Sequence, residues 1–534
     1  MFDTLLQGGT VHDGTGRVYE GWDVGIKDGR IAEIGPNLNT EDVQEVIPVQ
    51  GLIVAPGFVD MHTHSDFTLI ADGRAESQVH QGVTTEVIGQ CGISCAPVLS
   101  HDAIKQVSPW YTADAKYKGW LGFAEYLDAL DETALGVNVM AFVGHGTIHR
   151  AVMGDELHPG TAEDVKEMAQ LVERCIEEGA GGFSSGLEYF PGILSAPEHL
   201  VPMCEVAAKH NRLYATHVRN RDTEYDLGFA EAIETAQKSG SKLQISHIQP
   251  KFGAPEHAMN HTLEMIELAR RHDVDIAFDV IPHDWNHTLM AAILPKWAQA
   301  GGIDAVMKRL ADPEMREKIK ANPKPMWLIV KAKKWEDIVL LNATINKDIV
   351  GADFAEIGRM RGCDPYDAVL DILLEEGDNM MACMWSSKSF KDADVELCLQ
   401  QPECAVISDT VAIANEGILK DHVGSLSGYG WAARFLQYYV RDKKTLSLAE
   451  GLRKITSLPA TRLGLIDRGF IKQGYFADIC VFDAASITSN VTVKNPRRYA
   501  SGIAHVLVNG ELSMRNGKRT NTNAGRVLRD FKAA

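Results

Sequence analysis

Eight short apolar runs recur along the middle of the chain, and they constrain its fold more than any other feature. Segments with helical periodicity separate several of them, such as the one that opens at Thr161 and ends at Gly179. Strands that alternate with helices form parallel sheets, and eight such strands close into a (β/α)₈ barrel of the TIM type. The runs are residues 52–61, 84–89, 137–143, 181–185, 213–216, 243–246, 274–280 and 405–408. The sequence therefore predicts an α/β fold whose functional groups lie at the carboxyl ends of these strands.

The two ends of the chain follow a different pattern. Asp13-Gly14 and Asp28-Gly29 stand between alternating apolar residues, which is typical of β-hairpins, and similar segments return at 477–483 and 506–511. We therefore expect a small β-sandwich domain built from residues 1–55 and 466–534, with the barrel at 56–465. The first apolar run, 52–61, is expected to be one buried strand bent at Pro56-Gly57.

More than a hundred residues separate the seventh run from the eighth. Tryptophans at 285, 297, 327 and 335 and helical patterns indicate that this segment is folded, because a disordered linker would lack them. We expect an inserted subdomain at about 284–350 that acts as a lid over the functional face.

Composition excludes several classes of function. The 53 basic and 72 acidic residues give a net charge of −19, which argues against a nucleic-acid partner or an anionic membrane surface. The nine scattered cysteines indicate a reducing compartment. The chain shows neither a signal peptide nor a stretch of about 18 apolar residues, so we expect a soluble cytoplasmic protein.

Residue types that bind metal ions follow several of the predicted strands. His62 and His64 point to the same side of the first strand, about 7 Å apart along it, which suits one metal ion. Each residue alone has an ordinary structural explanation, such as a histidine bonded to a backbone carbonyl or a cysteine acting as a small apolar side chain. Together they predict a metal site formed by His62, His64, Cys91, His217, His247 and Asp409.

These strand-end residues, with a β domain built from both termini, resemble the amidohydrolase superfamily. Segments 144–146, 182–192, 216–219 and 456–465 are similar to those of the N-acyl-D-amino-acid deacylases, or D-aminoacylases, and the resemblance covers nearly the whole chain. It implies one tight zinc site at Cys91, His217 and His247. It also implies a second, weaker site at His62, His64 and Asp409, which the cysteine can bridge.

The resemblance implies hydrolysis of a small-molecule amide, an N-acyl-D-amino acid, to a carboxylate and a D-amino acid. Zinc lowers the pKa of bound water from about 15.7 to about 7, and Asp409 at the metal edge is placed to act as general base and then general acid. His145 and Tyr189 are expected substrate contacts. Their structural alternatives are a buried histidine and a packing aromatic.

Three departures from the deacylase pattern concern the substrate carboxylate. Gln249 stands where the family usually has a lysine, and Lys251 follows two residues later as a candidate replacement. His149 occupies the place of a family arginine, and 421–424 supplies no arginine where the family has His-Pro-Arg. Acyl preference, D versus L selectivity, the number of metals and the oligomeric state stay open.

Two other functions compete with this interpretation. Hydantoinases and dihydropyrimidinases open cyclic amides and imides with a carboxylated lysine at the end of the fourth strand, but Glu188 lies in that region and Cys91 supplies the bridging atom. A catalytically silent scaffold of the superfamily would have lost ligands, whereas all six ligand types persist here.

Overall fold

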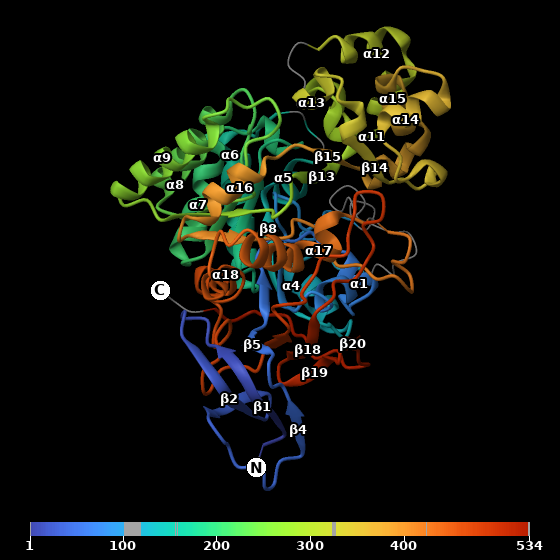
Figure 1. Ribbon diagram of the computed structural model, residues 1–534. Coiled ribbons are helices and arrows are strands. Elements are labelled where there is room, and N and C mark those ends of the chain that lie inside the picture. Colours follow the sequence, from blue (N-terminus) through green and yellow to red (C-terminus); the bar gives the residue numbers. More distant parts are fainter. Residues whose placement is uncertain are drawn as a thin grey trace.

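A computed structural model describes residues 2–100, 119–154, 156, 158–322, 327–422 and 424–531. Eight parallel strands form its central sheet, in the order β6-β7-β8-β9-β10-β11-β12-β16 (Figure 1). Each successive strand pairs with the next one along the chain, which is the topology of a (β/α)₈ barrel. The strands are β6 (Phe58–Asp60), β7 (Val83–Ile88), β8 (Asn138–Gly144), β9 (Gly182–Gly186), β10 (Leu213–His217), β11 (Lys242–Ile245), β12 (Ile276–Val280) and β16 (Cys404–Val406). The predicted fold class is confirmed.

The barrel closes just beyond the carboxyl ends of its first and last strands. Thr63 and Thr410 form a parallel bridge there. The Asp409 amide donates to the His62 carbonyl at 3.1 Å, and the His64 amide donates to the Thr410 carbonyl at 2.7 Å. The main-chain bonds that close the barrel therefore bring His62, His64 and Asp409 together.

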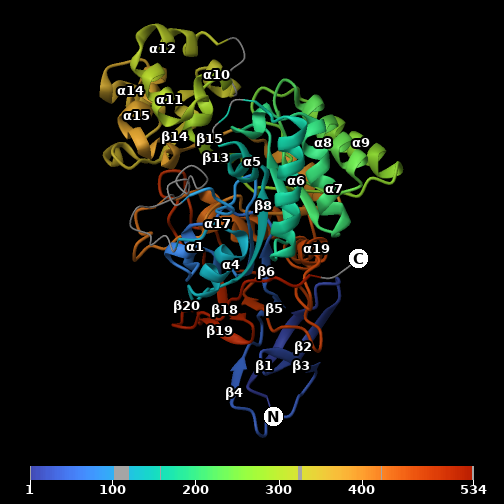
Figure 2. The ribbon, with the colours of Figure 1, turned by 180° about the vertical axis from the view of Figure 1, so that it is seen from behind.

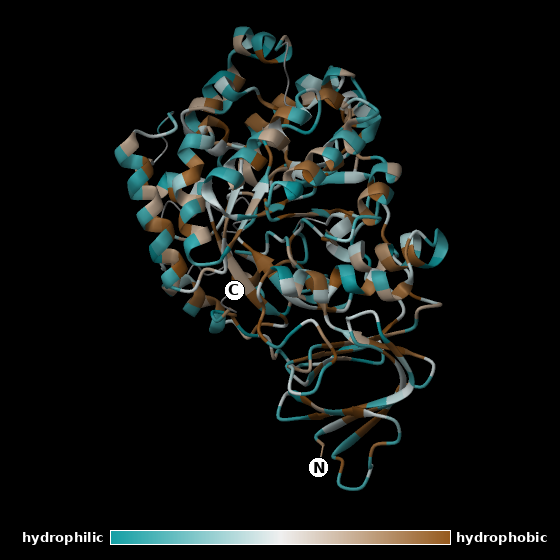
Figure 3. Cartoon of the chain, turned by 90° about the vertical axis from the view of Figure 1, so that its left-hand side faces the viewer, coloured by the Kyte–Doolittle hydropathy of each residue, from teal (hydrophilic) through white to brown (hydrophobic). Residues whose placement is uncertain are grey.

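Helices cover the outside of the barrel, as the two opposite views in Figures 1 and 2 show. Their sequences carry apolar and polar residues at helical spacing (Figure 3). Strand residues alternate between two cores: Val139, Ala141 and Val143 pack toward the helices, whereas Met140 and Phe142 fill the barrel interior. The main covering helices are α4 (Phe123–Asp131), α5 (His145–Met153), α6 (Ala162–Glu177), α7 (Pro197–Lys209), α8 (Tyr225–Ser239), α9 (Ala258–Arg271), α16 (Asp392–Leu399), α17 (Leu426–Arg434), α18 (Leu448–Ile455) and α19 (Ser457–Arg462).

A second sheet contains strands from both ends of the chain and lies at the bottom of Figure 1. Its order is β20-β19-β18-β17-β5-β1-β2-β3, with β4 paired to β1. Its strands are β1 (Thr4–His12), β2 (Val18–Lys27), β3 (Arg30–Gly35), β4 (Glu45–Pro48), β5 (Ile53–Pro56), β17 (Ile479–Phe482), β18 (Ile503–Val508), β19 (Glu511–Arg515) and β20 (Lys518–Arg519). Domain limits near residues 55 and 465 stay our proposal, and β5 and β17 are the strands nearest to them.

The first apolar run divides between the two sheets instead of forming one bent strand. Its first part is β5, which pairs with β17, and its second part is β6, which pairs with β7. Gly57 joins them at a point where a Cβ atom would come within 2.2 Å of the Thr84 side chain. The apolar pattern is continuous because both strands are buried, so it does not reveal the change of sheet.

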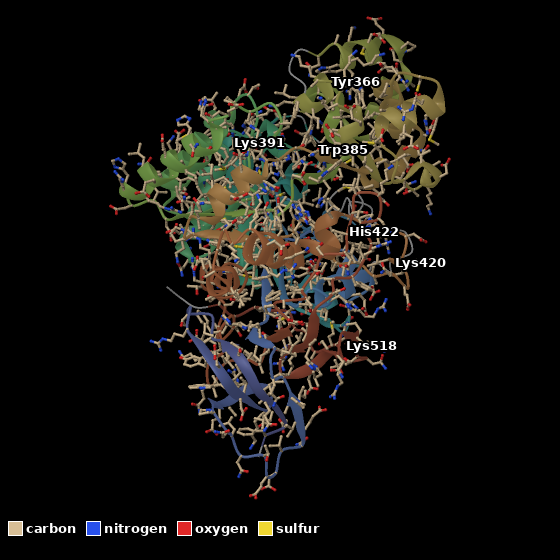
Figure 4. The ribbon with its side chains drawn as sticks, viewed as in Figure 1. Tyr366, Trp385, Lys391, Lys420, His422 and Lys518 are labelled. Atoms are coloured by element: carbon tan, nitrogen blue, oxygen red, sulfur yellow. The ribbon has the colours of Figure 1, made fainter. Side chains whose placement is uncertain are left out.

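The segment between β12 and β16 folds as a unit with its own core (Figure 4, which labels Tyr366 and Trp385 in it). A small antiparallel sheet in the order β13-β15-β14 joins it to the barrel, and we call residues 285–388 the inserted unit. It extends past residue 350, where the sequence pattern placed its end, because β15 is the central strand of its sheet. Residues 323–326 within it lie outside the described part. Its elements are β13 (Trp285–Leu289), β14 (Ile338–Asn342), β15 (Met384–Lys388), α10 (Lys296–Gln299), α11 (Gly302–Ala311), α12 (Pro313–Lys320), α13 (Leu328–Lys331), α14 (Phe354–Arg361), α15 (Pro365–Glu376) and the 3₁₀ segments η3 (Met290–Ile293) and η6 (Gly377–Ala382).

Among the helices that the structure describes, none combines the length and the apolar character needed to cross a membrane.

Candidate metal centre

The Cys91 thiol lies in the middle of three histidines at the carboxyl face of the barrel. Its Sγ is 3.3 Å from His62 Nε2, 3.6 Å from His217 Nδ1 and 3.4 Å from His247 Nε2. All four side chains are buried. The strand ends thus bring together residues that are as much as 185 positions apart in the sequence (247 − 62).

Asp409 lies against the first two histidines. Its Oδ1 is 3.2 Å from His62 Nε2 and 3.2 Å from His64 Nε2. The ring centroids of the two histidines are 5.4 Å apart, as the alternation of side chains along a strand predicted. The structure therefore gathers all six residues predicted as ligands, and we call this set the metal centre.

The backbone at three of these residues is unusual. Cys91, His247 and Asp409 have φ values of +53°, +35° and +52°, which non-glycine residues rarely adopt. Gly89 precedes Cys91 where a Cβ atom would lie 2.0 Å from the Phe142 carbonyl oxygen, so only glycine fits there. Strained backbone of this kind costs roughly 1–3 kcal/mol per residue and concentrates at functional sites.

The charges in the metal centre are divided between anionic and cationic groups. Burial opposes ionisation of the Cys91 thiol and of Asp409, but the surrounding histidines outweigh it and hold both pKa values well below their ordinary range. Burial also opposes a charge on His62 and His64, yet Asp409 and Cys91 raise the pKa of His64 to about 9 and that of His62 well above its ordinary value. The thiolate and the carboxylate thus form an anionic site that takes up protons when no other cation neutralises it.

This donor set fits a divalent metal ion. The ligand atoms of His62, His64, Cys91 and Asp409 lie within 4.8 Å of one another, as do those of Cys91, His217 and His247. Thiolate, imidazole and carboxylate are the ligands that zinc takes in proteins. Cys91 belongs to both groups.

Buried carboxylates outside the metal centre support two of its histidines, His217 through its ring and His247 through its main-chain amide. Glu188 Oε2 accepts a hydrogen bond from His217 Nε2 at 2.7 Å, so the lone pair of His217 Nδ1 faces Cys91. Lys251 pairs with the other oxygen of Glu188. Burial disfavours the ionised Glu188, but Lys251 and His217 outweigh it and lower its pKa to about 2.

Asp279 supports His247 in a different way. Its Oδ1 accepts from the His247 amide at 2.6 Å, and its Oδ2 accepts from Gln244 Nε2 at 2.8 Å. Sequence reasoning assigned no role to Asp279 and saw Glu188 only as a residue near a strand end. A buried acid within an apolar strand was the available signal for Asp279, whereas nothing in the sequence pairs Glu188 with Lys251.

A cavity of about 450 Å³ leads from the metal centre to the inserted unit. Cys91 and Gly92 line its inner end. Its outer walls come from α5, from the turn after β9, and from β13, η3, α11 and η6. Figures 1 and 2 both show α5 beside β13 and β15. The inserted unit thus forms part of the wall of the cavity.

The three residues expected to contact substrate lie in different surroundings. Tyr189 lines the cavity, with its ring 4.8 Å from the His217 ring and its hydroxyl 3.1 Å from Thr288 Oγ1. His145 is fully buried 3.4 Å from Ser195 Oγ and is not among the residues that line the cavity. Lys251 is also buried, bound to Glu188, and so supports His217 from behind.

The positions that depart from the deacylase pattern have structural partners. Gln249 is fully buried and bonds both the amide and the carbonyl of Ile281. His149 Nε2 lies 3.1 Å from the His158 carbonyl oxygen. Arg497, from the C-terminal part of the chain, donates to the His422 carbonyl in the segment 421–424. Val423 of this segment lies outside the described residues.

Comparison with known proteins agrees with this geometry. The model of the amidohydrolase family matches residues 45–325 and 420–514. The chain belongs to the amidohydrolase family. This amidohydrolase is 31% identical to the D-aminoacylase of Alcaligenes xylosoxydans xylosoxydans, over 99% of the chain and 97% of the relative. It is 30% identical to the N-acyl-D-glutamate deacylase of the same organism, over 95% and 93%.

Solved structures of deacylases superpose closely on this amidohydrolase. The N-acyl-D-glutamate deacylase from Bordetella bronchiseptica, crystallised with zinc and a phosphonate mimic of the tetrahedral intermediate, superposes with a TM-score of 0.83 at 27% identity, covering 99% of this chain and 100% of that one. A D-aminoacylase structure superposes at 0.81 with 28% identity and the same coverage. A D-hydantoinase at 0.53 and 16% identity shares the fold. The resemblance to the D-aminoacylases seen in the sequence is confirmed.

Proposed function

We propose that the protein is a zinc-dependent deacylase that hydrolyses N-acyl-D-amino acids to a carboxylate and a D-amino acid. The observation that carries the proposal is the position of Cys91 Sγ, which lies 3.3–3.6 Å from three histidine nitrogens at the inner end of a cavity. The named relatives, a D-aminoacylase and an N-acyl-D-glutamate deacylase, support the choice of a linear acyl amide.

The six residues of the metal centre would hold the metal. A zinc ion bound there supplies a Lewis acid for the amide carbonyl and lowers the pKa of a bound water to about 7. We assign the tighter binding to Cys91, His217 and His247, because Glu188 orients the His217 ring and Asp279 holds the His247 main-chain amide. His62, His64 and Asp409 would form a second metal site that binds more weakly.

Asp409 is the residue that moves the proton. Its carboxylate is ionised at neutral pH, since neighbouring histidines hold its pKa well below the ordinary value despite burial. It accepts one proton from the attacking water and delivers that proton to the amide nitrogen as the C–N bond breaks. Water thus supplies the hydroxyl group of the carboxylate product and the hydrogen of the released amine.

Tyr189 and the surrounding cavity would position the substrate. The Tyr189 hydroxyl is hydrogen-bonded to Thr288 of the inserted unit, and the Tyr189 ring packs against His217. We therefore place the acyl amide between Tyr189 and the metal centre. Buried Glu188, paired with Lys251, stands near the end of the fourth strand in place of a carboxylated lysine, so the structure offers no support for the hydantoinase-like alternative.

The proposal is tested by removing and restoring metal. Chelation should abolish hydrolysis of N-acetyl-D-leucine, and added Zn²⁺ should restore it in proportion to the zinc bound. N-acetyl-L-leucine serves as the matched substrate, and we expect its rate to be much lower. Full activity in protein shown to be metal-free would overturn the zinc mechanism, and equal rates for the two enantiomers would overturn the D assignment.

A further inference from the structure

The loop that follows β11 lies against the inserted unit. Phe252 packs on the core of that unit, and Gly253 stands where a Cβ atom would come within 2.3 Å of Leu328 Cδ1. Gly253 also has a φ of +97°, a conformation that favours glycine. Because no side chain fits at Gly253, the loop and the start of α13 are in close contact.

Lys251, the residue before Phe252, is the charged group of this contact. Its side chain is 2% exposed, and its Nζ lies 3.9 Å from the centroid of the Trp327 ring, directly before α13. Among the residues that the structure describes, Glu188 is the one hydrogen-bond acceptor of this ammonium group. A buried ammonium is removed from water, so the face of an indole ring stabilises it strongly. Trp327 and Glu188 together therefore fix the position of the Lys251 ammonium.

From Glu188 the contacts continue to a ligand of the metal centre. Glu188 binds Lys251 through one oxygen and accepts from His217 Nε2 through the other, at 2.7 Å. The Nδ1 atom of the same ring faces Cys91 Sγ at 3.6 Å. The orientation of a metal-binding imidazole depends on the partner of its second nitrogen. A shift of Lys251 would thus change how Glu188 holds His217.

A second set of contacts joins the same histidine to the inserted unit. The Tyr189 ring lies 4.8 Å from the His217 ring, and the Tyr189 hydroxyl lies 3.1 Å from Thr288 Oγ1 in β13. The Trp327 ring packs edge to face on Trp385 of β15, the strand that pairs with β13, with 5.6 Å between the ring centroids (Trp385 is labelled in Figure 4). The inserted unit therefore reaches His217 by two routes, one through Lys251 and one through Tyr189.

We propose that Trp327 is a positioning residue for the metal centre. It fixes Lys251, and Lys251 fixes the carboxylate that orients His217. The docking of the inserted unit on the loop after β11 then sets how tightly the centre holds its ion. The inference rests on the metal centre of the proposed function and is independent of the substrate. Zinc binding and docking of the inserted unit favour each other, since coupling between two events is reciprocal.

The first test measures the zinc affinity of the full-length protein by competition with a chelator. Trp327→Leu should weaken zinc binding about 3- to 10-fold, less than the loss of a direct partner of a ligand, because it acts through two intervening side chains. Trp327→Phe keeps an aromatic face over the ammonium and should recover most of the affinity. Trp335→Leu is the matched control. This buried tryptophan of the same unit packs on Phe354 and Tyr366, so its loss should destabilise the unit and leave zinc affinity unchanged.

The route through Lys251 is tested in the background Glu188→Gln/Lys251→Met. Adding Trp327→Leu there should change zinc affinity by less than about twofold, because residues of one network have non-additive effects. The full loss in this background would overturn the proposal. So would equal affinities of Trp327→Leu and the wild type, or equal losses in Trp327→Leu and Trp335→Leu.

The zinc measurement also separates this inference from the proposed activity. A wild-type protein that binds no zinc would overturn the metal centre and the role of Trp327 together. A wild-type protein that binds zinc but does not hydrolyse N-acetyl-D-leucine would overturn the deacylase function alone, and the affinities of the variants would still decide the role of Trp327.

The second test uses the reciprocity of the coupling and needs no turnover. Added zinc should slow hydrogen exchange in α13 and in the loop after β11 of the wild type, since bound metal favours the docked inserted unit. The protection should be smaller in Trp327→Leu and unchanged in Trp335→Leu. Wild-type exchange that zinc does not alter in these two segments would overturn the coupling.

Discussion

The two halves of the metal centre are held in place by different means. We call Cys91, His217 and His247 the braced half, because Glu188 bonds the His217 ring and Asp279 bonds the His247 main-chain amide. We call His62, His64 and Asp409 the closure half, since the main-chain bonds that close the barrel bring them together.

The halves also differ in protonation. In the braced half, burial and Arg221 lower the pKa of His247 to about 3, and neighbouring histidines lower that of Cys91. In the closure half, the pKa of His64 is raised to about 9. Cys91 and His247 of the braced half are thus ready to bind a cation at neutral pH, whereas His64 of the closure half must first release a proton. This difference supports our proposal that the braced half binds the tighter metal ion and that Asp409 of the closure half carries the proton.

The largest effect is expected from the residue that the two groups of ligands share. Cys91→Ala removes the central donor and should lower kcat/KM by at least about 10³-fold while zinc content falls toward zero. Cys204→Ala is the matched control, because this fully buried thiol lies in α7, away from the centre. It should reduce stability and leave zinc content unchanged. Substantial zinc and turnover in Cys91→Ala would show that the braced half does not depend on the thiolate.

The second largest effect is expected from Asp409, whose substitution should lower turnover without removing the metal. Asp409→Asn keeps the size of the side chain but removes the proton acceptor, so kcat should fall about 10²- to 10⁴-fold. Zinc in the braced half should remain, as measured by metal analysis of the same sample. If zinc is lost together with activity, Asp409 is a ligand of the tight site and the division into two halves is wrong.

A smaller effect should follow from loss of the outer support. Glu188→Gln weakens the hold on His217, so zinc affinity should fall about 10- to 100-fold and excess zinc should restore activity. The change also leaves Lys251 buried without its partner, which destabilises the fold. The double variant Glu188→Gln/Lys251→Met removes that second effect, and Glu163→Gln on the exposed surface of α6 is the control. Unchanged zinc affinity in the double variant would remove Glu188 from the braced half.

Much of the fold, and the convergence of the six candidate ligands at one face of the barrel, could be predicted from the sequence. Apolar runs identify barrel strands because both faces of a parallel strand are buried, and ligand types at the ends of these runs converge because parallel strands end at one edge. The same continuity concealed the change of sheet at Gly57. The late end of the inserted unit was missed because it depends on the pairing of β15 with β13 and β14, which are distant in sequence.

Contacts between distant side chains could not be predicted in this way. The bond between Lys251 and Glu188 depends on how the loop after β11 folds back, and the sequence pattern offered Lys251 as a substrate contact instead. Arg150 lines the cavity because of the position of α5 relative to Gly92, which no local pattern specifies. The Lys251–Glu188 pair depends on loop conformation and the position of Arg150 depends on helix placement. Both are set by tertiary packing.

The last prediction concerns the pH dependence of zinc binding, which distinguishes the two halves. Zinc must displace protons from His62 and His64, whose pKa values are raised, so affinity of the closure half should increase about tenfold per pH unit for each proton released, up to about pH 9. Between pH 6 and 8 the braced half should change less, because Cys91 and His247 have lowered pKa values and are already deprotonated. Calorimetric zinc titrations in buffers of different ionisation enthalpy count these protons for each binding step. Equal proton release in both steps would mean that the two halves titrate as one unit, and the contrast between them would then be limited to their structural supports.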